Sequence, residues 1–359
     1  DWARYWNGDV EGNPVPAEEA HTTFIVPISD QWTMPSGGNP INGVRAQVAT
    51  PDGTLNKIYY FGVAGENTGW QRGLPTLIDT YSSGGTQPVQ RQMTTWTQDN
   101  TSSLYIINPR VAETSLYNAA GNRSRTQITY DQLTLADTTA YSVPTYIYET
   151  GNSATILRTL RTDYKLDASY TNLRILGLVR QKRLYEGDPN NGGVLLSNIE
   201  IFYDESNTID GDDAPVQHDH PNYPATFSVR GNATSVKRNN VTATPAQSTT
   251  THMRYNTTGA VTSLKDALDH QVTMSYADSF SDSVNRNTFA YPTTITDAGN
   301  FSSSVQYNYD FGATTRTQSP SPAGQSQGAI QAMSYNDRGQ LERITTTNNS
   351  AYKRFWYGA

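Results

Sequence analysis

One stretch of the sequence gathers the side chains best suited to chemistry, the segment YDESNTIDGDDAPVQHDHPNY at 203 to 223. Carboxylates on a loop are ligands for Ca²⁺, and two histidines one residue apart could reach a transition metal from one strand face. The candidate ligands are Asp210, Asp212, Asp213, His218 and His220. Their spacing matches neither an EF-hand nor a zinc signature, and Asp, Gly, Asn and Pro also build exposed turns. We therefore predict a structural loop and no metal site, with an ion-binding loop as the alternative.

The search for catalytic motifs also favours a structural protein. The sequence has no Gly-x-Ser-x-Gly elbow, no His-Glu-x-x-His and no phosphate-cradling loop. Paired carboxylates of a glycosidase lie far apart in sequence and leave no motif, so a glycosidase-like hydrolase remains a hypothesis. The prediction is a protein that is not an enzyme and uses no cofactor.

The six tryptophans offer a further kind of site, because an exposed indole ring can stack on a sugar. Tryptophan in a β protein is more often packed across strands, which favours a structural role. An adhesin or carbohydrate-binding module is the alternative. The six residues are Trp2, Trp6, Trp32, Trp70, Trp96 and Trp356.

The composition indicates which elements carry these residues. Of 359 residues, 16% are charged and 35% are apolar, with 23 tyrosines and 27 glycines, which is the chemistry of strands and turns. A net charge of −7 without a basic run gives no footprint for nucleic acid. No apolar stretch is long enough to span a bilayer as a helix. The absence of cysteine fits a bacterial exported protein, secreted or at the cell surface.

A Tyr-x-x-x-Gly step recurs near the C-terminus, followed each time by a short strand, a polar turn and a strand that ends on tyrosine. It begins at Tyr255 with Gly259 and at Tyr335 with Gly339, and in shortened form at Tyr309 and Asp310 with Gly312. The closing tyrosines of the strands are Tyr276, Tyr309, Tyr335 and Tyr357. A unit of this kind cannot bury its face alone and must stack on its neighbours.

Alternation within the closing strands predicts how they lie, since successive side chains point to opposite faces. In FSSSVQYNY, at 301 to 309, Phe301, Val305, Tyr307 and Tyr309 share one face and the hydroxyl and amide side chains share the other. In HQVTMSY, at 270 to 276, Val272, Met274 and Tyr276 do the same. Tyrosine rings stack across strands while their hydroxyls meet water, so such a sheet needs no thick dry core.

The turn of each unit has its own chemistry. Glycine supplies a positive φ, and an Asn or Asp after the tyrosine bonds to its own backbone. Further upstream, RAQVATPDGTLNKIYYFG at 45 to 62 predicts a hairpin with its turn at Pro51, Asp52 and Gly53.

Residues 255 to 357 resemble the YD repeats of RHS-repeat proteins, whose units run Tyr-Asp-x-x-Gly, strand, turn, strand, Tyr. Tyr309 and Asp310 keep the Asp, and the other two steps have Asn. TNLRILGLVRQKRLYE at 171 to 186 and HDHPNYPATFSVRGNATSV at 218 to 236 resemble segments N-terminal to the repeats in large bacterial members. The resemblance implies an all-β fold, in which a YD-repeat β-hairpin ribbon spirals into a shell or solenoid-like wall, as in bacterial RHS shells and teneurins.

The resemblance also sets the expected organisation and role. Residues 1–124 are predicted as a β-rich region that is part of the wall or a plug, and residues 125–359 as the repeat region. The predicted function is a non-catalytic wall that encloses or displays a partner or toxin domain. Its strand edges are expected to pair with further copies or with the rest of the same polypeptide.

Overall fold

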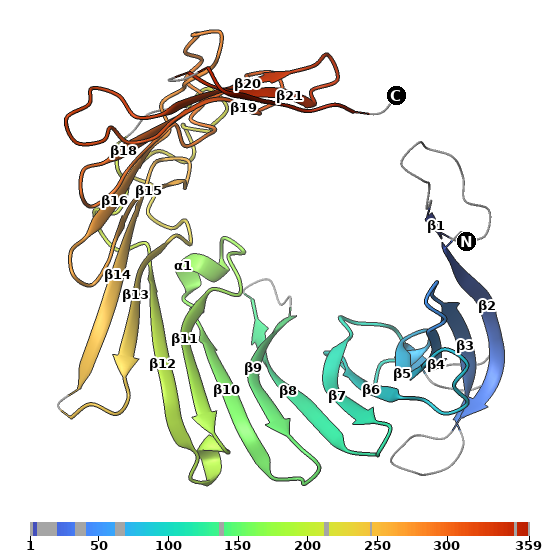
Figure 1. Ribbon diagram of the computed structural model, residues 1–359. Coiled ribbons are helices and arrows are strands. Elements are labelled where there is room, and N and C mark those ends of the chain that lie inside the picture. The colour runs from blue at the N-terminus through green and yellow to red at the C-terminus, as the bar shows by residue number, and fades with distance from the viewer. Residues whose placement is uncertain are drawn as a thin grey trace. The chain divides into compact units, whose positions relative to one another are not determined.

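The computed structural model describes residues 3–5, 20–32, 41–61, 69–135, 140–211, 215–244, 246–347 and 350–357 (Figure 1). Nearly every element in these ranges is a strand. The chain forms two compact units, the first made of residues 1–164 and 182–198 and the second of residues 165–181 and 199–359. The predicted boundary between residues 124 and 125 falls inside a paired hairpin of the first unit. The division into an N-terminal β-rich region and a repeat region stays a prediction.

The first unit is a run of strands in which each pairs antiparallel with the next in the chain. The strands are β1 (Ala3–Tyr5), β2 (Ala20–Trp32), β3 (Ile41–Ala49), β4 (Leu55–Phe61), β5 (Pro75–Tyr81), β6 (Gln90–Thr97), β7 (Arg110–Asn118), β8 (Arg123–Thr134), β9 (Ala140–Thr150) and β10 (Ile156–Tyr164). Two 3₁₀ turns, Gly69–Gln71 and Pro189–Asn191, complete it. Strands β11 (Val179–Glu186) and β12 (Val194–Tyr203) have residues in both units.

The second unit repeats this plan with shorter strands and longer connections. Its strands are β13 (Ala233–Asn240), β14 (Gln247–Tyr255), β15 (Val261–Lys265), β16 (Gln271–Ser275), β17 (Thr294–Thr296), β18 (Ser302–Tyr307), β19 (Thr314–Gln318), β20 (Ile330–Tyr335), β21 (Leu341–Thr346) and β22 (Tyr352–Arg354). The helix α1 (Ala168–Thr171) is a single turn. The all-β fold expected from the sequence is confirmed, and within the described ranges no helix is long and apolar enough to cross a membrane.

The hairpin expected at 45 to 62 is confirmed as β3 and β4. Gly53 has a φ of 82°, and the Asp52 carboxylate accepts a hydrogen bond of 3.0 Å from the Thr54 amide. The turn residues therefore close the hairpin by the means that their types allow.

The predicted alternation is seen in β16 but not in β18. In β16 the side chains of Val272 and Met274 are half-buried, whereas those of Gln271, Thr273 and Ser275 are exposed. In β18 the residues from Ser303 to Tyr307 are all half-buried. One face of β16 is therefore open to water, while β18 is partly covered on both faces.

The sheet has little apolar core. Tyr59, Leu77 and Met93 lie opposite one another on β4, β5 and β6, and this group is the buried hydrophobic cluster of the described residues. Most other buried side chains carry a hydroxyl group, chiefly those of threonine and serine. The strands are therefore held mainly by their backbone ladders and by specific polar contacts, which makes those contacts the natural place to look for a functional arrangement.

Candidate functional site: the closing aromatics and the loops on them

The turn after each repeat tyrosine has one design. Asn256 Oδ1 accepts hydrogen bonds from the amides of Thr258 and Ala260 at 3.1 and 2.9 Å. Asn336 Oδ1 accepts from Arg338 and Gln340, both at 3.0 Å. The glycines of these turns have positive φ values, 86° at Gly259, 73° at Gly339 and 69° at Gly312, which confirms their predicted conformational role.

A second feature recurs more widely. An aromatic residue in or just after one strand donates a hydrogen bond from its side chain to a backbone carbonyl in or just before the preceding strand. We call these residues the closing aromatics. The donors, acceptors and distances are Trp96 to Pro75 (2.7 Å), Tyr130 to Val111 (2.7 Å), Tyr164 to Pro144 (2.8 Å), Tyr203 to Val179 (2.9 Å), Tyr255 to Ala233 (2.6 Å), Tyr307 to Pro292 (3.0 Å), Tyr335 to Thr314 (2.7 Å) and Tyr357 to Leu341 (2.8 Å).

A β-bulge in the following strand lies opposite most of these residues. The pairing register with the following strand shifts immediately before five closing aromatics, which are Trp96, Tyr130, Tyr255, Tyr307 and Tyr335. The extra residue lies in the following strand, as Thr262 does opposite Arg254 and Tyr255, and a bulge increases the local twist of the strand pair. Here the side chain reaches back to the carbonyl of the preceding strand, so each closing aromatic ties two strands together beyond their ladder.

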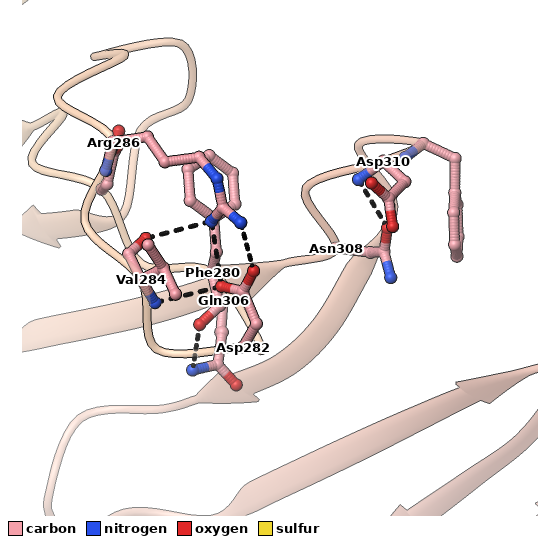
Figure 2. Close-up of polar contacts among 9 residues, drawn as sticks. Phe280, Asp282, Val284, Arg286, Gln306, Asn308 and Asp310 are labelled. Atoms are coloured by element: carbon pink, nitrogen blue, oxygen red, sulfur yellow. Dashed lines mark hydrogen bonds and ion pairs between the residues drawn. The ribbon is translucent and has the colours of Figure 1, made fainter.

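The structure places the repeat residues differently from the sequence in one unit. Tyr307, not Tyr309, holds the closing position. The next residue, Asn308, accepts from the amides of Asp310 and Phe311 at 2.8 and 3.2 Å (Figure 2). Asn308 therefore has the role that Asn256 and Asn336 have in their turns. One extra residue separates this tyrosine from Gly312, which hides the match. Tyr309 is half exposed, and its ring packs edge-on against Phe280 at 5.2 Å.

The other predicted repeat tyrosines include three that are closing aromatics and one that is not. Tyr255, Tyr335 and Tyr357 are closing aromatics. Tyr276 follows β16, and no carbonyl among the described residues accepts from its hydroxyl. The sequence did not lead us to predict five closing aromatics, which are Trp96, Tyr130, Tyr164, Tyr203 and Tyr307. Each of these donors follows its acceptor by 15 to 24 residues, and this spacing was the signal that could have identified them.

Two inserted loops bond to the backbone of a closing aromatic, one at Tyr255 and one at Tyr307. The Tyr255 amide donates to Thr208 at 2.9 Å, and its carbonyl accepts from Asp210 at 2.6 Å. The Tyr307 amide donates to Ser279 at 2.9 Å, and its carbonyl accepts from Ser281 at 2.8 Å. In both cases the loop adds a short parallel bridge, Ile209 with Tyr255 and Phe280 with Tyr307.

The loop from Ala277 to Tyr291 is fixed by one carboxylate. Asp278 accepts from the amides of Arg286, Thr288 and Phe289, at 2.8, 3.0 and 3.2 Å. Burial opposes ionisation of Asp278, but the hydrogen bonds from Thr288 and the neighbouring amides outweigh it, so the pKa of Asp278 lies below its ordinary value.

The side chain of Arg286 also holds this loop in place. The Arg286 guanidinium pairs with Asp282 at 2.6 Å and donates to the Val284 carbonyl (Figure 2). It also lies 4.0 Å from the centre of the Tyr309 ring. Gln306 donates to the Phe280 carbonyl at 3.2 Å. The loop is thus a fixed cover on β18.

The loop from Asp204 to Asn232 has an equivalent anchor. The Asp204 carboxylate accepts from the amides of Arg230, Gly231 and Asn232 at 2.9, 2.7 and 3.0 Å, and from the Tyr170 hydroxyl at 2.9 Å. Burial raises the pKa of Tyr170, and the hydrogen bond to Asp204 raises it further.

Arg230 holds the other side of this loop. Its guanidinium donates to the Phe227 carbonyl at 2.8 Å, to the Thr257 carbonyl at 2.7 Å and to the Pro224 carbonyl at 2.5 Å. A single side chain therefore connects the loop with the turn that follows Tyr255.

The predicted ion loop lies within this region, and the carboxylate of Asp210 already has two protein partners. Asp210 binds Arg254 Nε at 2.6 Å and the Thr262 hydroxyl at 2.7 Å, and these contacts hold the pKa of Asp210 low against the opposing effect of burial. His218 and His220 lie with ring centres 6.2 Å apart. Asp212 and Asp213 lie outside the described residues. Across the described ranges no three His, Asp or Glu side chains are grouped as metal ligands would be.

Comparison with known proteins adds a likeness in fold. No protein-family model and no curated protein sequence matches the chain. A crystal structure of TcdB2-TccC3 without its hypervariable C-terminal region matches with a TM-score of 0.53 and 10% identity, over 94% of this chain and 22% of that one. A crystal structure of TcdB2-TccC3-Cdc42 matches with a TM-score of 0.34 and 13% identity, over 96% of this chain and 15% of that one. This chain spans about a fifth of the length of the first match, and the likeness supports an RHS-like fold.

Proposed function

We propose that the chain is a non-catalytic structural segment of a secreted or cell-surface bacterial RHS/YD-repeat protein. Its role is to form a β wall that encloses or displays a partner or toxin domain. The observation that carries the proposal is the closing aromatic, which recurs eight times among the described residues. Repetition of one structural contact is what a wall requires, whereas a catalytic site requires one unique cluster of groups.

The fold likeness to TcdB2-TccC3, a protein whose described form lacks a hypervariable C-terminal region, supports the same proposal. The polar side chains that the sequence offered for chemistry have structural partners in the wall. Asp204 anchors a loop, and Asp210 pairs with Arg254.

The wall is further proposed to associate through its strand edges. Among the described residues β22 pairs with β21 alone, through Ile344 and Lys353 and their neighbours. The Phe355 amide donates to the Glu342 carbonyl, and the Ala351 carbonyl accepts from Thr346, so the odd-numbered residues of β22 face β21. The amide of Tyr352 therefore points to the other side, where a further strand could add.

Self-association is tested by replacing Tyr352 with proline, which removes this outward amide and no bond to β21. Sedimentation velocity of the unmodified chain should show mass increasing with protein concentration, and Tyr352→Pro should weaken that association. Tyr352→Ala is the matched control, because it removes the ring but keeps the amide, and it should associate like the unmodified chain. A monodisperse monomer at all concentrations would contradict edge pairing.

A further inference from the structure

The two inserted loops of the second unit occupy equivalent positions on the sheet. The paired register of β14 with β13 ends at His252, three residues before Tyr255. The register of β18 with β17 ends at Ser304, three residues before Tyr307. Beyond these points the ladder with the preceding strand is missing, and a loop bonds to the backbone of the closing tyrosine in its place.

Both loops fill this position with the same kind of tripeptide. The carbonyl of its first residue accepts from the tyrosine amide, and the amide of its third residue donates to the tyrosine carbonyl. The middle residue is large and apolar and forms the parallel bridge. The first residue carries a hydroxyl and the third is small and polar. The tripeptides are Thr208, Ile209 and Asp210 at Tyr255, and Ser279, Phe280 and Ser281 at Tyr307.

The middle residue adds apolar contact to the backbone bonds. Phe280 is 4% exposed, and its ring packs edge-on against Tyr309 at 5.2 Å. Its carbonyl accepts from the Gln306 side chain at 3.2 Å (Figure 2). The loop therefore binds as a strand added to a sheet does, with main-chain bonds for affinity and one side chain for specificity.

Tyr335 has the same position without a loop. The register of β20 with β19 ends at Ala332, again three residues before the closing tyrosine. The Asn336 amide donates to the Gln340 carbonyl at 3.0 Å, so Asn336 faces β21 and the backbone of Tyr335 faces the opposite side. In the described part of the chain, no residue outside the strands bonds to the amide or carbonyl of Tyr335 through its backbone. Tyr335 therefore presents the backbone groups that bind a loop at Tyr255 and at Tyr307.

The connection that supplies the loop elsewhere is too short here. At Tyr255 and Tyr307 the loop belongs to the connection before the first strand of the pair, residues 204–232 and 276–293. At Tyr335 this connection is residues 308–313, which form the turn on Asn308. A tripeptide at Tyr335 has therefore to come from another segment of polypeptide.

The turn also leaves apolar surface beside this position. Phe311 is 49% exposed, and its ring packs edge-on against the Tyr335 ring at 5.3 Å. An apolar middle residue that binds next to Tyr335 could bury part of this ring.

We propose that Tyr335 is an attachment point for an extended segment of the partner domain that the wall encloses or displays. The segment has a Ser or Thr, a large apolar residue and a Ser or Asp in succession, and it runs parallel to β20. The inference rests on the proposed function for the identity of the partner, and on the two occupied positions for the chemistry of the segment. A short peptide with so few contacts should bind weakly, with a Kd of about 1 mM.

NMR titration of the chain labelled with ¹⁵N-tyrosine tests this position. The probe is the peptide Ala-Asp-Ser-Phe-Ser-Asp-Ser, which copies residues 277–283. The amide signal of Tyr335 should shift and saturate, whereas those of Tyr255 and Tyr307 should stay, because loops already occupy them. Each signal is assigned by its loss in the variants Tyr335→Phe, Tyr255→Phe and Tyr307→Phe.

Two N-methylated peptides are matched controls. A methyl group on the amide of the serine that follows phenylalanine removes the donor to the Tyr335 carbonyl and should weaken binding at least about tenfold. A methyl group on the phenylalanine amide should leave binding nearly unchanged, because the middle residue of the parallel bridge directs its own amide away from the tyrosine.

Absence of a shift at Tyr335, or equal weakening by the two methyl groups, would overturn the proposal. A Tyr335 signal that moves with the concentration of the chain alone would also overturn it, because this would assign the position to a second copy. None of these results concerns the closing contacts, so the proposed wall would stand without its attachment point.

Discussion

Replacing Asp204 with alanine should lower the free energy of unfolding of the second unit by about 4 kcal/mol. The Asp204 carboxylate accepts from three consecutive backbone amides and from the Tyr170 hydroxyl. Each charge-assisted hydrogen bond contributes about 1.5–3 kcal/mol, and these contributions overlap because one group makes all four. Urea unfolding followed by circular dichroism measures the loss.

Two controls separate the carboxylate from the backbone. Asp204 has a φ of 52°, which alanine tolerates poorly and glycine tolerates well. If the carboxylate dominates, Asp204→Gly should be nearly as destabilising as Asp204→Ala. Asp204→Asn keeps one acceptor oxygen and suits the positive φ, so it should lose about half as much. Stability restored by glycine would show that backbone strain, and not the anchor, explains the alanine result.

Replacing Tyr255 with alanine should cost the second unit about 3–5 kcal/mol, the range for removing a buried aromatic side chain. Tyr255 is 8% exposed, its hydroxyl binds the Ala233 carbonyl, and its backbone carries the bridge to the loop at Ile209. The cavity would weaken both the strand pair and the loop above it. Hydrogen exchange should rise at the amides of residues 208 to 210 together with those of β13.

Tyr255→Phe isolates the hydroxyl. It keeps the ring and removes the bond to Ala233 and the longer contact with Met253 Sδ, which should cost about 1 kcal/mol. An alanine variant no less stable than the phenylalanine variant would show that the ring does not pack as the structure has it.

Much of the fold could be predicted from local sequence because the causes are local. The hairpin around Gly53 follows from Pro-Asp-Gly between two alternating runs, and the positive φ of Gly259 and Gly339 follows from the turn chemistry of Tyr-Asn-x-x-Gly. The open face of β16 follows from its alternation. These features need only neighbouring residues.

The closing contact could not be predicted in the same way. Its acceptor is a backbone carbonyl, which any residue can supply, and in five of the eight cases it occurs opposite a bulge, which adds a residue without a sequence signature. At Tyr307 the extra residue before Gly312 shifted the apparent repeat to Tyr309 and Asp310. In the first unit the position is taken by Trp96 as well as by Tyr130, so a search for tyrosine alone misses it.

The loop anchors were hidden for a related reason. Asp204 and Arg230 are 26 residues apart and meet only because the intervening segment folds back on β14. In the sequence, Asp204 belonged to a cluster that suggested an ion site, and its partners in the structure are backbone amides, which carry no side-chain signal.

The central claim is that a side-chain hydrogen bond from one aromatic residue closes eight of the successive strand pairs, and it is tested most directly at neighbouring tyrosines. Tyr307 donates to the Pro292 carbonyl, whereas Tyr309 packs its ring on Phe280 and Arg286. Measured by urea unfolding, Tyr307→Phe should lower the free energy of unfolding by about 1 kcal/mol, and Tyr309→Phe should leave it unchanged. A larger loss for Tyr309→Phe than for Tyr307→Phe would contradict the account.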